Sequence, residues 1–316
     1  MTRIPVVVDD PSPYLSTNST RPKAGWIAIA LATACLIVTV VQIIFSIKHR
    51  AKVASTLIFA SSLQCISLVE FAYSSSYPLS TSWMAAGAVF SWMAGPVLTF
   101  YCTQIFGRAA RAGSMSNPGH SKPLRGFVRC NTTIFGLLVF VAWLIVATGS
   151  AVVTIGAPQG QVDSGNLPVV TAGQGVMKAG LVLQLVVLLS LVLIVWRFRV
   201  ISTHWNVDWD ARRRFTWTWK RLITIILSSI GLLLLGQIYH VARFFANSNE
   251  KPWLALIFDA FPSLGILVVL TIFHPGLCLP PSLLNITARH AGVEEVVEIE
   301  MVKSSKASSP KSVHFQ

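Results

Sequence analysis

The stretch GWIAIALATACLIVTVVQIIFSI, residues 25–47, decides the fold of this 316-residue chain. It carries no charged side chain and slightly exceeds the roughly 20 residues that an α-helix needs to cross the hydrocarbon core of a bilayer. The apolar part of a cleavable signal peptide is shorter, about 7–15 residues. We therefore predict that residues 25–47 form a membrane-spanning helix and that further spans follow.

Six more apolar runs of similar length follow this one. They are residues 53–73, 83–106, 133–154, 176–196, 222–242 and 253–273. Each run is expected to be helical, because lipid offers no hydrogen-bond partner to an open backbone. The composition agrees, since only 12% of the residues are charged, against about 25% in soluble domains. The fold class that we predict is all-α: a polytopic membrane protein with a seven-transmembrane helix bundle.

The basic residues predict the orientation of these spans. Most of the 25 Lys and Arg residues lie after the first, third and fifth runs and in the C-terminal tail, whereas the linkers after the second and fourth runs carry none. Because Lys and Arg accumulate on the cytoplasmic side, we expect the N-terminus outside and the C-terminus in the cytoplasm. Residues 1–24 are then an extracellular segment with a glycosylation sequon at Asn18. Residues 25–275 are the seven-span domain, and residues 276–316 are a largely disordered cytoplasmic tail.

The net charge of +13 does not point to nucleic acid, because the basic residues come in short blocks between long apolar runs. The partners that we predict are membrane lipids and an amphipathic small-molecule substrate. The five cysteines show no CxxC spacing, and the chain has no Gly-rich phosphate loop, metal-ligand spacing or nucleophile motif. We expect no metal, no cofactor and no ATPase within this chain.

Five ionisable side chains fall in or at the ends of the apolar runs and point to a binding site. They are Glu70, Lys178, His240, Arg243 and Asp259. Such residues cost a few kcal/mol inside a span, so they usually have a partner or a function. In the predicted orientation all five lie within about 10 Å of the outer boundary. We interpret them as a substrate-binding cluster for the polar head of an amphipathic molecule. The alternative is hydrogen bonding between helices, with snorkelling of Lys178 and Arg243.

Four other residues are expected to shape or gate the bundle. Pro96 and Pro262, the latter next to Asp259, each remove a backbone hydrogen bond and predict a kink. Gln184 is expected to hydrogen-bond between helices, like the other glutamines of the spans. His274 precedes a Pro-Gly pair at the inner end of the last run, where we expect it to cap a helix end.

Four tryptophans flank the basic block after the fifth run: Trp205, Trp209, Trp217 and Trp219. Tryptophan is enriched at membrane–water interfaces because its ring is amphipathic. We interpret these residues as an aromatic belt that anchors the fifth and sixth spans. The alternative is a cytoplasmic site for lipid head groups.

Several short motifs resemble those of a known family. In the fifth run, residues 180–184 (GLVLQ) look like its Gly-Leu-x-x-Gln signature. In the seventh run, residues 258–262 (FDAFP) and 274–276 (HPG) look like its Phe-Asp…His-Pro-Gly pattern. Residues 70–73 (EFAY) and the pairs Gly-Pro and Gly-Arg within residues 95–108 are similar to its second-span and third-span motifs. The family is the fungal lipid-translocating exporter family, whose members are RTA-like seven-transmembrane proteins.

The chain departs from this family's pattern at two places. Tyr239 is followed by His240 and Arg243, where the family usually shows Tyr-Arg-x-x-Glu. Asn131 stands where the family has an aspartate. The chain therefore resembles a divergent member of the family.

The resemblance implies a fungal membrane protein that moves or senses amphipathic lipids. Of the motif residues, Glu70 and Asp259 carry over as polar-site residues, and Gln184 and His274 as structural ones. The function that we predict is a transporter or exporter of amphipathic lipids or toxic lipophilic compounds in the plasma membrane, and not an enzyme. Two alternatives stay open: a seven-span receptor or sensor, and a membrane enzyme of the terpene-cyclase type that uses Glu70 and Asp259 as acids.

Overall fold

The structure is a computed structural model that describes residues 21–49, 51–74, 81–116, 122–156, 167–205, 218–246, 254 and 256–279. Every regular element within these residues is helical. The helices are α1 (Arg21–His49), α2 (Ala54–Ser74), α3 (Thr81–Ser116), α4 (Lys122–Gly156), α5 (Leu167–Ile201), α6 (Trp219–Ala246), α8 (Phe261–Ile272) and α9 (Pro275–Cys278). Two single turns complete the set: η3 (Ser202–His204) follows α5, and the π-helical η4 (Leu256–Ala260) precedes α8.

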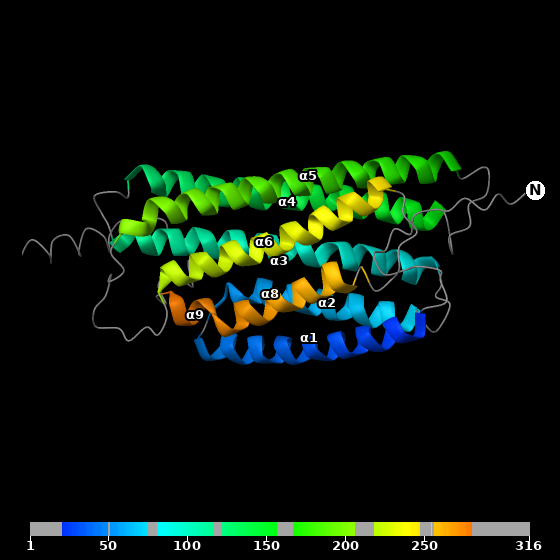
Figure 1. Cartoon of the computed structure of the whole chain (residues 1–316), viewed down its shortest axis with the longest axis horizontal. Coiled ribbons are helices and arrows are strands. Elements are labelled where there is room, and N and C mark those ends of the chain that lie inside the picture. Colours follow the sequence, from blue (N-terminus) through cyan, green and yellow to red (C-terminus); the bar gives the residue numbers. More distant parts are fainter. Residues whose placement is uncertain are drawn as a thin grey trace, which may run out of the picture.

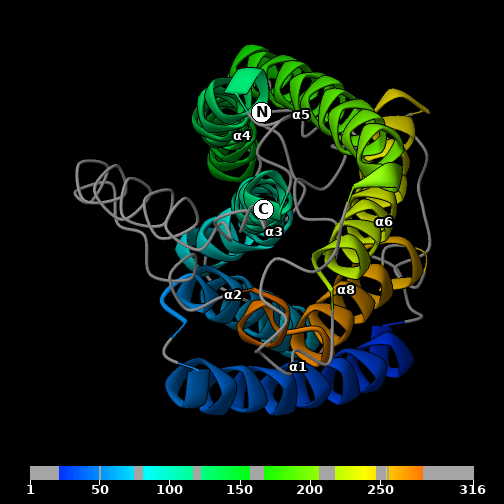
Figure 2. The ribbon, with the colours of Figure 1, turned by 90° about the vertical axis from the view of Figure 1, so that its left-hand side faces the viewer.

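The long helices lie side by side and alternate in direction along the chain, so the molecule is an up-and-down bundle (Figure 1). Seen along the bundle axis, α3 lies near the centre, with α4 and α5 on one side and α1 and α2 on the other (Figure 2). The helices α6 and α8 lie on a third side, where α6 packs on α3, α5 and α8. The bundle therefore surrounds α3 with protein on most sides.

Six helical segments are long and apolar enough to cross a membrane. They are Gly25–His49, Ala54–Tyr73, Thr133–Gly156, Leu167–His204, Trp219–Phe245 and Leu256–Cys278. Six of the seven predicted spans are thereby confirmed by length and composition. The helix α3 is not among them, although its 36 residues include the predicted run 83–106. A helix that contacts other helices rather than lipid needs less apolar surface, which explains its lower hydropathy. That α3 is the seventh span stays a prediction.

The distribution of side chains is that of a protein in lipid. Large apolar residues cover the outside: Trp26, Leu137 and Leu193 are each more than 60% exposed. Polar residues such as Gln42 and Ser61 are fully buried between helices. In a membrane the bundle interior is the place where polar groups find partners, whereas the lipid-facing surface is apolar.

A chain of hydrogen bonds ties α1 to α2 and α8. The Nε2 atom of Gln42 donates to Oγ1 of Thr271 at 2.8 Å, and the Ser61 hydroxyl donates to Oε1 of Gln42 at 3.0 Å. The Thr39 hydroxyl in turn donates to Oγ of Ser61 at 2.9 Å. The interhelical hydrogen bonding predicted for glutamines is therefore confirmed for Gln42.

Replacing Gln42 with leucine is expected to lower the free energy of unfolding by about 1 kcal/mol. The loss is modest because the Ser61 hydroxyl can donate to the carbonyl oxygen of Ile58 instead, and the Thr271 hydroxyl keeps its hydrogen bond to the carbonyl oxygen of Leu267. Thermal unfolding of the detergent-solubilised protein measures the effect as a fall of roughly 2–4 °C in Tm. Ile43→Leu, on an exposed part of the same helix, is the control. An equal effect of the two variants would show that the hydrogen bonds contribute nothing.

Glycines allow α4 and α5 to approach closely. A Cβ atom on Gly149 of α4 would lie 2.6 Å from the backbone nitrogen of Met177 and 2.8 Å from the carbonyl oxygen of Gly173. On α5, a Cβ atom on Gly180 would lie 2.9 Å from the backbone nitrogen of Val146. The two backbones touch at these points, and only glycine fits there. Gly180 is the first residue of the fifth-run motif, so this motif carries helix packing.

An aromatic cluster joins the C-terminal end of α5 to the N-terminal end of α6. The rings of Trp205 and Trp219 lie 6.3 Å apart, and both contact Phe198. Trp205 is 7% exposed and Trp219 only 1%, so these two rings pack inside the protein. The prediction that they form an aromatic belt facing the membrane interface is wrong, because the bundle itself covers them. Trp209 and Trp217 lie outside the described residues.

Candidate functional site

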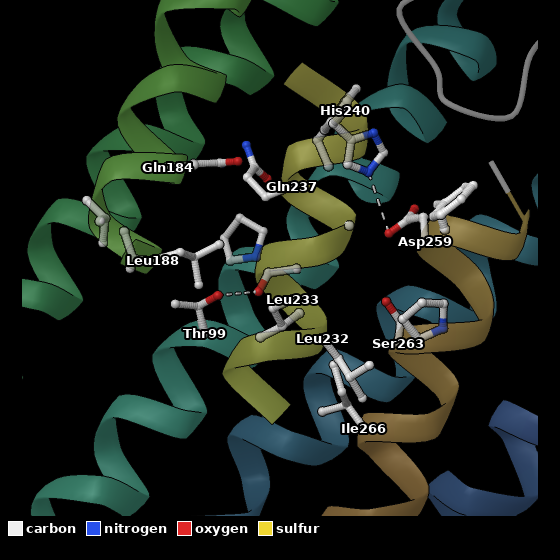
Figure 3. Close-up of a pocket in the computed structure, with 18 residues that line it drawn as sticks. Thr99, Gln184, Leu188, Leu232, Leu233, Gln237, His240, Asp259, Ser263 and Ile266 are labelled. Carbon is white, nitrogen blue, oxygen red and sulfur yellow. Dashed lines mark hydrogen bonds and ion pairs between the residues drawn. The ribbon is translucent and has the colours of Figure 1, made fainter. Parts of the chain in front are cut away.

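A cavity lies between α3, α5, α6 and the η4–α8 segment, toward the end of the bundle where α6 ends and α8 begins (Figure 3). The residues that line it are Trp92, Gly95, Pro96, Thr99, Val139, Gln184, Val187, Leu188, Leu232, Leu233, Gly236, Gln237, His240, Phe258, Asp259, Pro262, Ser263 and Ile266. The cavity has a volume of about 50 Å³, counted as the space that the centres of water molecules can occupy. One buried water needs about 10–15 Å³ on this measure, so the cavity holds a few waters in this conformation.

An acid and a base meet at the wall of the cavity. The Nε2 atom of His240 on α6 lies 3.6 Å from Oδ1 of Asp259 on η4, and we call these two residues the acid–base pair (Figure 3). The Asp259 side chain is 20% exposed and the His240 side chain 7%. The ring of Trp92 lies 4.8 Å from the imidazole, centroid to centroid, and holds it from the α3 side. The Nδ1 atom of His240 is buried and has no hydrogen-bond partner among the described residues.

The π-helical turn η4 sets the position of Asp259. Pro262 follows this turn as the second residue of α8, and it lacks the N–H that an α-helix would offer to the carbonyl of Phe258. The sequence predicts a proline kink here; the structure has a π-helical turn that ends at Ala260, two residues before the proline. A π-helical turn inserts an extra residue and thereby changes which way the preceding side chains point, and such turns are frequent at functional sites.

Glycine brings α6 close to this turn. A Cβ atom on Gly236 would lie 3.1 Å from the carbonyl oxygen of Phe258, which is tighter than ordinary contact. One turn further along the same helix, the Tyr239 ring stacks on the Phe258 ring with centroids 4.9 Å apart. Contacts on both sides of Phe258 therefore hold the η4 turn against α6, which brings His240 and Asp259 together.

Two glutamines add amide groups at the same end of the cavity (Figure 3). The Nε2 atom of Gln237 donates to the carbonyl oxygen of Leu181 at 2.9 Å, so its Oε1 keeps its capacity to accept. The Nε2 atom of Gln184 is buried without a hydrogen-bond partner in the described part of the chain. The interhelical hydrogen bond expected for Gln184 is thus absent at its nitrogen. An unpaired buried amide costs about 1–3 kcal/mol, which water or a polar ligand group would offset.

The cavity wall is divided between polar and apolar residues. The acid–base pair and the two glutamine amides lie at one end, and Leu232, Leu233 and Ile266 lie at the other (Figure 3). The Thr99 hydroxyl, between them, donates to the carbonyl oxygen of Gly95 at 3.0 Å. The arrangement offers acceptors and donors to a polar group and apolar contacts to a hydrocarbon chain.

The structure brings together five of the residues singled out in the sequence. His240 and Asp259 line the cavity. Three residues that the sequence predicts to shape or gate the bundle also line it: Pro96, Gln184 and Pro262. The helix α3 continues through Pro96 without interruption. These positions come from four different segments of the chain, and the bundle places them around one space.

The other predicted residues lie elsewhere. Glu70 does not line the cavity; its half-buried side chain on α2 has an Oε1 atom without a partner among the described residues. Lys178 and Arg243 do not line it either, and Nζ of Lys178 lies 5.7 Å from the ring centroid of Phe245. His274 caps α9 at its N-terminus, where its Nδ1 accepts from the N–H of Gly276 at 3.1 Å. The sequon at Asn18 is outside the described residues.

Sequence reasoning missed several residues of the site. Trp92 and Thr99 on α3 share the helical face of Pro96, and Ser263 lies one turn after Asp259. Their helical spacing from Pro96 and Asp259 could have indicated these residues. It was not sufficient, because these runs are apolar around most of their circumference and the sequence does not say which faces meet.

The comparisons with known proteins agree with a membrane protein of this architecture. A family model described as RTA1-like protein matches residues 57–282, well over half of the chain, and includes the whole cavity. No curated protein and no solved structure matched the chain.

Proposed function

This chain belongs to the RTA1-like protein family, and from that premise we propose that it translocates or exports amphipathic lipids or lipophilic compounds. It is a multi-pass membrane protein with six helical segments that are long and apolar enough to span a membrane. The cavity between α3, α5, α6 and α8 is the site proposed for the polar head of the substrate.

The observation that carries this proposal is the amphipathic wall of the cavity. Its polar end combines a carboxylate, an imidazole and two amides, one of which has a buried nitrogen without a partner among the described residues. Its other end is formed by leucine and isoleucine side chains. Because an ionisable group inside the membrane is costly, an acid at such a place favours a substrate path rather than packing alone.

The small size of the cavity indicates a closed conformation. A space for a few waters does not admit a lipid, so the substrate enters only when the helices around the site move apart. The η4 turn and the start of α8 are the expected place of that movement, because helices bend at π-helical turns and at prolines.

The orientation of the protein is part of the proposal. An extracellular N-terminus and a cytoplasmic tail put the polar end of the cavity in the outer half of the plasma membrane. The positive-inside rule supports this orientation, because the basic residues Arg108, Arg199 and Arg221 lie at the opposite end of the helices from the cavity. With this orientation the site faces the leaflet from which export is completed.

Filling the cavity tests the function without removing a polar group. Gly95 lines the cavity, and a Cβ atom there meets nothing within 4 Å. We expect Gly95→Leu to slow translocation at least about tenfold, equivalent to about 1.4 kcal/mol, because the side chain occupies the space of the substrate head. The measurement is the movement of fluorescent (NBD-labelled) sphingoid bases, phospholipids and monoacylglycerols across the membrane of proteoliposomes.

Gly175→Leu is the matched control, since a Cβ atom on Gly175 also meets open space but Gly175 lies outside the cavity lining. It is expected to translocate like the unmodified protein. The function is wrong if the unmodified protein moves none of the labelled amphipaths faster than protein-free liposomes. The assignment of the cavity is wrong if both variants are equally active.

A further inference from the structure

The hydrogen-bonding groups of the cavity wall indicate which kind of polar head fits there. In two of these groups the donor is bound to the protein, so the oxygen is the part offered to a ligand. The Nε2 atom of Gln237 donates to the carbonyl oxygen of Leu181 at 2.9 Å, which leaves Oε1 as the acceptor end of the amide. The Thr99 hydroxyl has a single proton and donates it to the carbonyl oxygen of Gly95 at 3.0 Å, so its oxygen offers only lone pairs.

The acid of the acid–base pair adds to these acceptors. The Asp259 side chain is 20% exposed and lines the cavity. A carboxyl group can accept a hydrogen bond whether or not it carries a proton, so this contribution does not depend on its charge. Three side chains, from α3, α6 and η4, therefore present acceptors to one space.

One amide of the wall is a donor that lacks an acceptor. Gln184 on α5 is 7% exposed, and its Nε2 atom is buried without a hydrogen-bond partner among the described residues. The side chains of Gln184 and Gln237 point toward one another at the polar end of the cavity (Figure 3). A ligand head that reaches this end therefore meets several acceptors and, beside them, one unsatisfied donor.

The described wall of the cavity carries no permanent positive charge. Its lining residues include neither lysine nor arginine, and Nε2 of His240 faces Asp259. Lys178 on α5 and Arg243 on α6 are not among the lining residues. An anionic head would therefore find no lysine or arginine along this lining, in a membrane where an unpaired charge is costly.

Three common kinds of lipid head differ in how they suit these groups. A phosphate monoester offers acceptor oxygens, so it suits the Gln184 nitrogen but faces the acceptors of the other three side chains. An ammonium has donors and no acceptor, so it suits those acceptors but leaves the Gln184 nitrogen unpaired. A hydroxyl both donates and accepts. A head with two or more hydroxyls therefore suits both kinds of group and brings no charge into the membrane.

We propose that the cavity selects amphipaths with an uncharged polyol head, and that Gln184 and Gln237 determine this specificity. The inference rests on the proposed translocation function and names the substrate class of the same site. Hydroxyl protons of the head donate to Oε1 of Gln237 and to the Thr99 oxygen, and a hydroxyl oxygen accepts from Nε2 of Gln184 once the cavity opens. The leucine and isoleucine side chains at the other end contact the hydrocarbon chain.

Competition between matched heads tests this specificity. NBD-labelled monoacylglycerol is bound to the detergent-solubilised full chain and displaced by unlabelled amphipaths with the same hydrocarbon chain. These are monoacylglycerol, its di-O-methyl ether, lysophosphatidic acid and the corresponding alkylamine; the ether keeps the oxygens of the polyol and removes its donors. We expect each of the other three heads to bind at least about tenfold more weakly than the polyol, equivalent to about 1.4 kcal/mol. The proposal is overturned if the ether, the phosphate or the ammonium head displaces the label as well as the polyol does.

Gln184→Leu assigns the preference to the cavity. It is expected to weaken monoacylglycerol binding about tenfold and to leave alkylamine binding unchanged, because an ammonium does not use the Gln184 nitrogen. Gln64→Leu is the matched control, since Gln64 on α2 is also buried, with an Nε2 atom that has no partner among the described residues, but does not line the cavity. It is expected to keep the preference of the unmodified protein. Equal preferences in the two variants would contradict the role of Gln184.

Gln237→Arg is expected to change the specificity rather than to remove it. The guanidinium keeps a donor for the carbonyl of Leu181 and replaces an acceptor of the cavity with a positive charge. Lysophosphatidic acid is expected to bind this variant at least about tenfold more tightly than it binds the unmodified protein. Unchanged binding of lysophosphatidic acid would show that Gln237 does not determine the specificity.

Proteoliposomes separate this inference from the function on which it rests. If the unmodified protein moves labelled phospholipids and sphingoid bases as fast as labelled monoacylglycerol, translocation holds and the polyol specificity is wrong. If it neither binds nor moves any labelled amphipath, the proposed function fails and the specificity fails with it.

Discussion

Asp259→Leu is expected to lower translocation about hundredfold while the folded protein stays at least as stable as the unmodified one. The substrate head loses its hydrogen bonds to this acid; a hydrogen bond to a charged group contributes about 1.5–3 kcal/mol, and about 2.7 kcal/mol corresponds to a hundredfold change. Stability is expected not to fall, because an apolar residue replaces an acid inside the membrane. This combination of lost activity and kept stability distinguishes a substrate site from a packing contact.

Translocation of labelled amphipaths in proteoliposomes and thermal unfolding in detergent measure the two effects together. Lys178→Leu is the control, since this cation lies at the same end of the helices but does not line the cavity. It is expected to leave translocation unchanged. A similar loss in both variants would mean that charge at this end of the helices matters and not the cavity. A large fall in the stability of Asp259→Leu would mean that the acid–base pair serves the fold.

Gly149→Leu is expected to lower the free energy of unfolding by about 3 kcal/mol, the upper end of the range for overpacked cores. The reason is that all three nearest atoms to a Cβ atom at Gly149 belong to the backbone of α5, the closest at 2.6 Å. A backbone cannot rotate away as a side chain can, so α4 and α5 must separate along much of their length. The matching fall in Tm is roughly 10 °C, measured in detergent.

Gly231→Leu is the matched control, because a Cβ atom there meets nothing within 4 Å. It is expected to keep or slightly raise Tm, since glycine inside a helix is about 0.5–1 kcal/mol less favourable than alanine. Equal Tm values for Gly149→Leu and Gly231→Leu would contradict the close approach of α4 to α5. The comparison uses the same substitution, so it removes the effect of helix propensity.

The two ionisable residues of the cavity could be identified from the sequence. Charged residues are rare within apolar runs, so Asp259 and His240 stand out, and both line the cavity. Glu70 and Lys178 stand out for the same reason but do not line it. Depth along a span follows from residue number, whereas the direction that a side chain faces around the helix does not. The sequence therefore does not separate the residues that line the cavity from those that lie outside it.

The outcome for tryptophan shows the same limit. Trp205 and Trp219 lie next to a basic segment, which is where interfacial tryptophans are found, yet both rings pack inside the bundle. Trp92, in contrast, had no distinguishing neighbour in the sequence and contacts the imidazole of the acid–base pair. Composition around a residue indicates its depth, and only the packing of helices indicates its partner.

The sequence by itself determined that this is a helical membrane protein with spans at defined positions, which the described helices bear out for six spans. It did so because lipid imposes a strong and local rule: about 20 apolar residues, with every backbone group paired within the helix. Tertiary structure alone decided that α3 lies at the centre, that a π-helical turn precedes Pro262, and that His240 and Asp259 lie 3.6 Å apart. These features depend on which helix faces meet, and that choice follows from close packing between segments far apart in the chain.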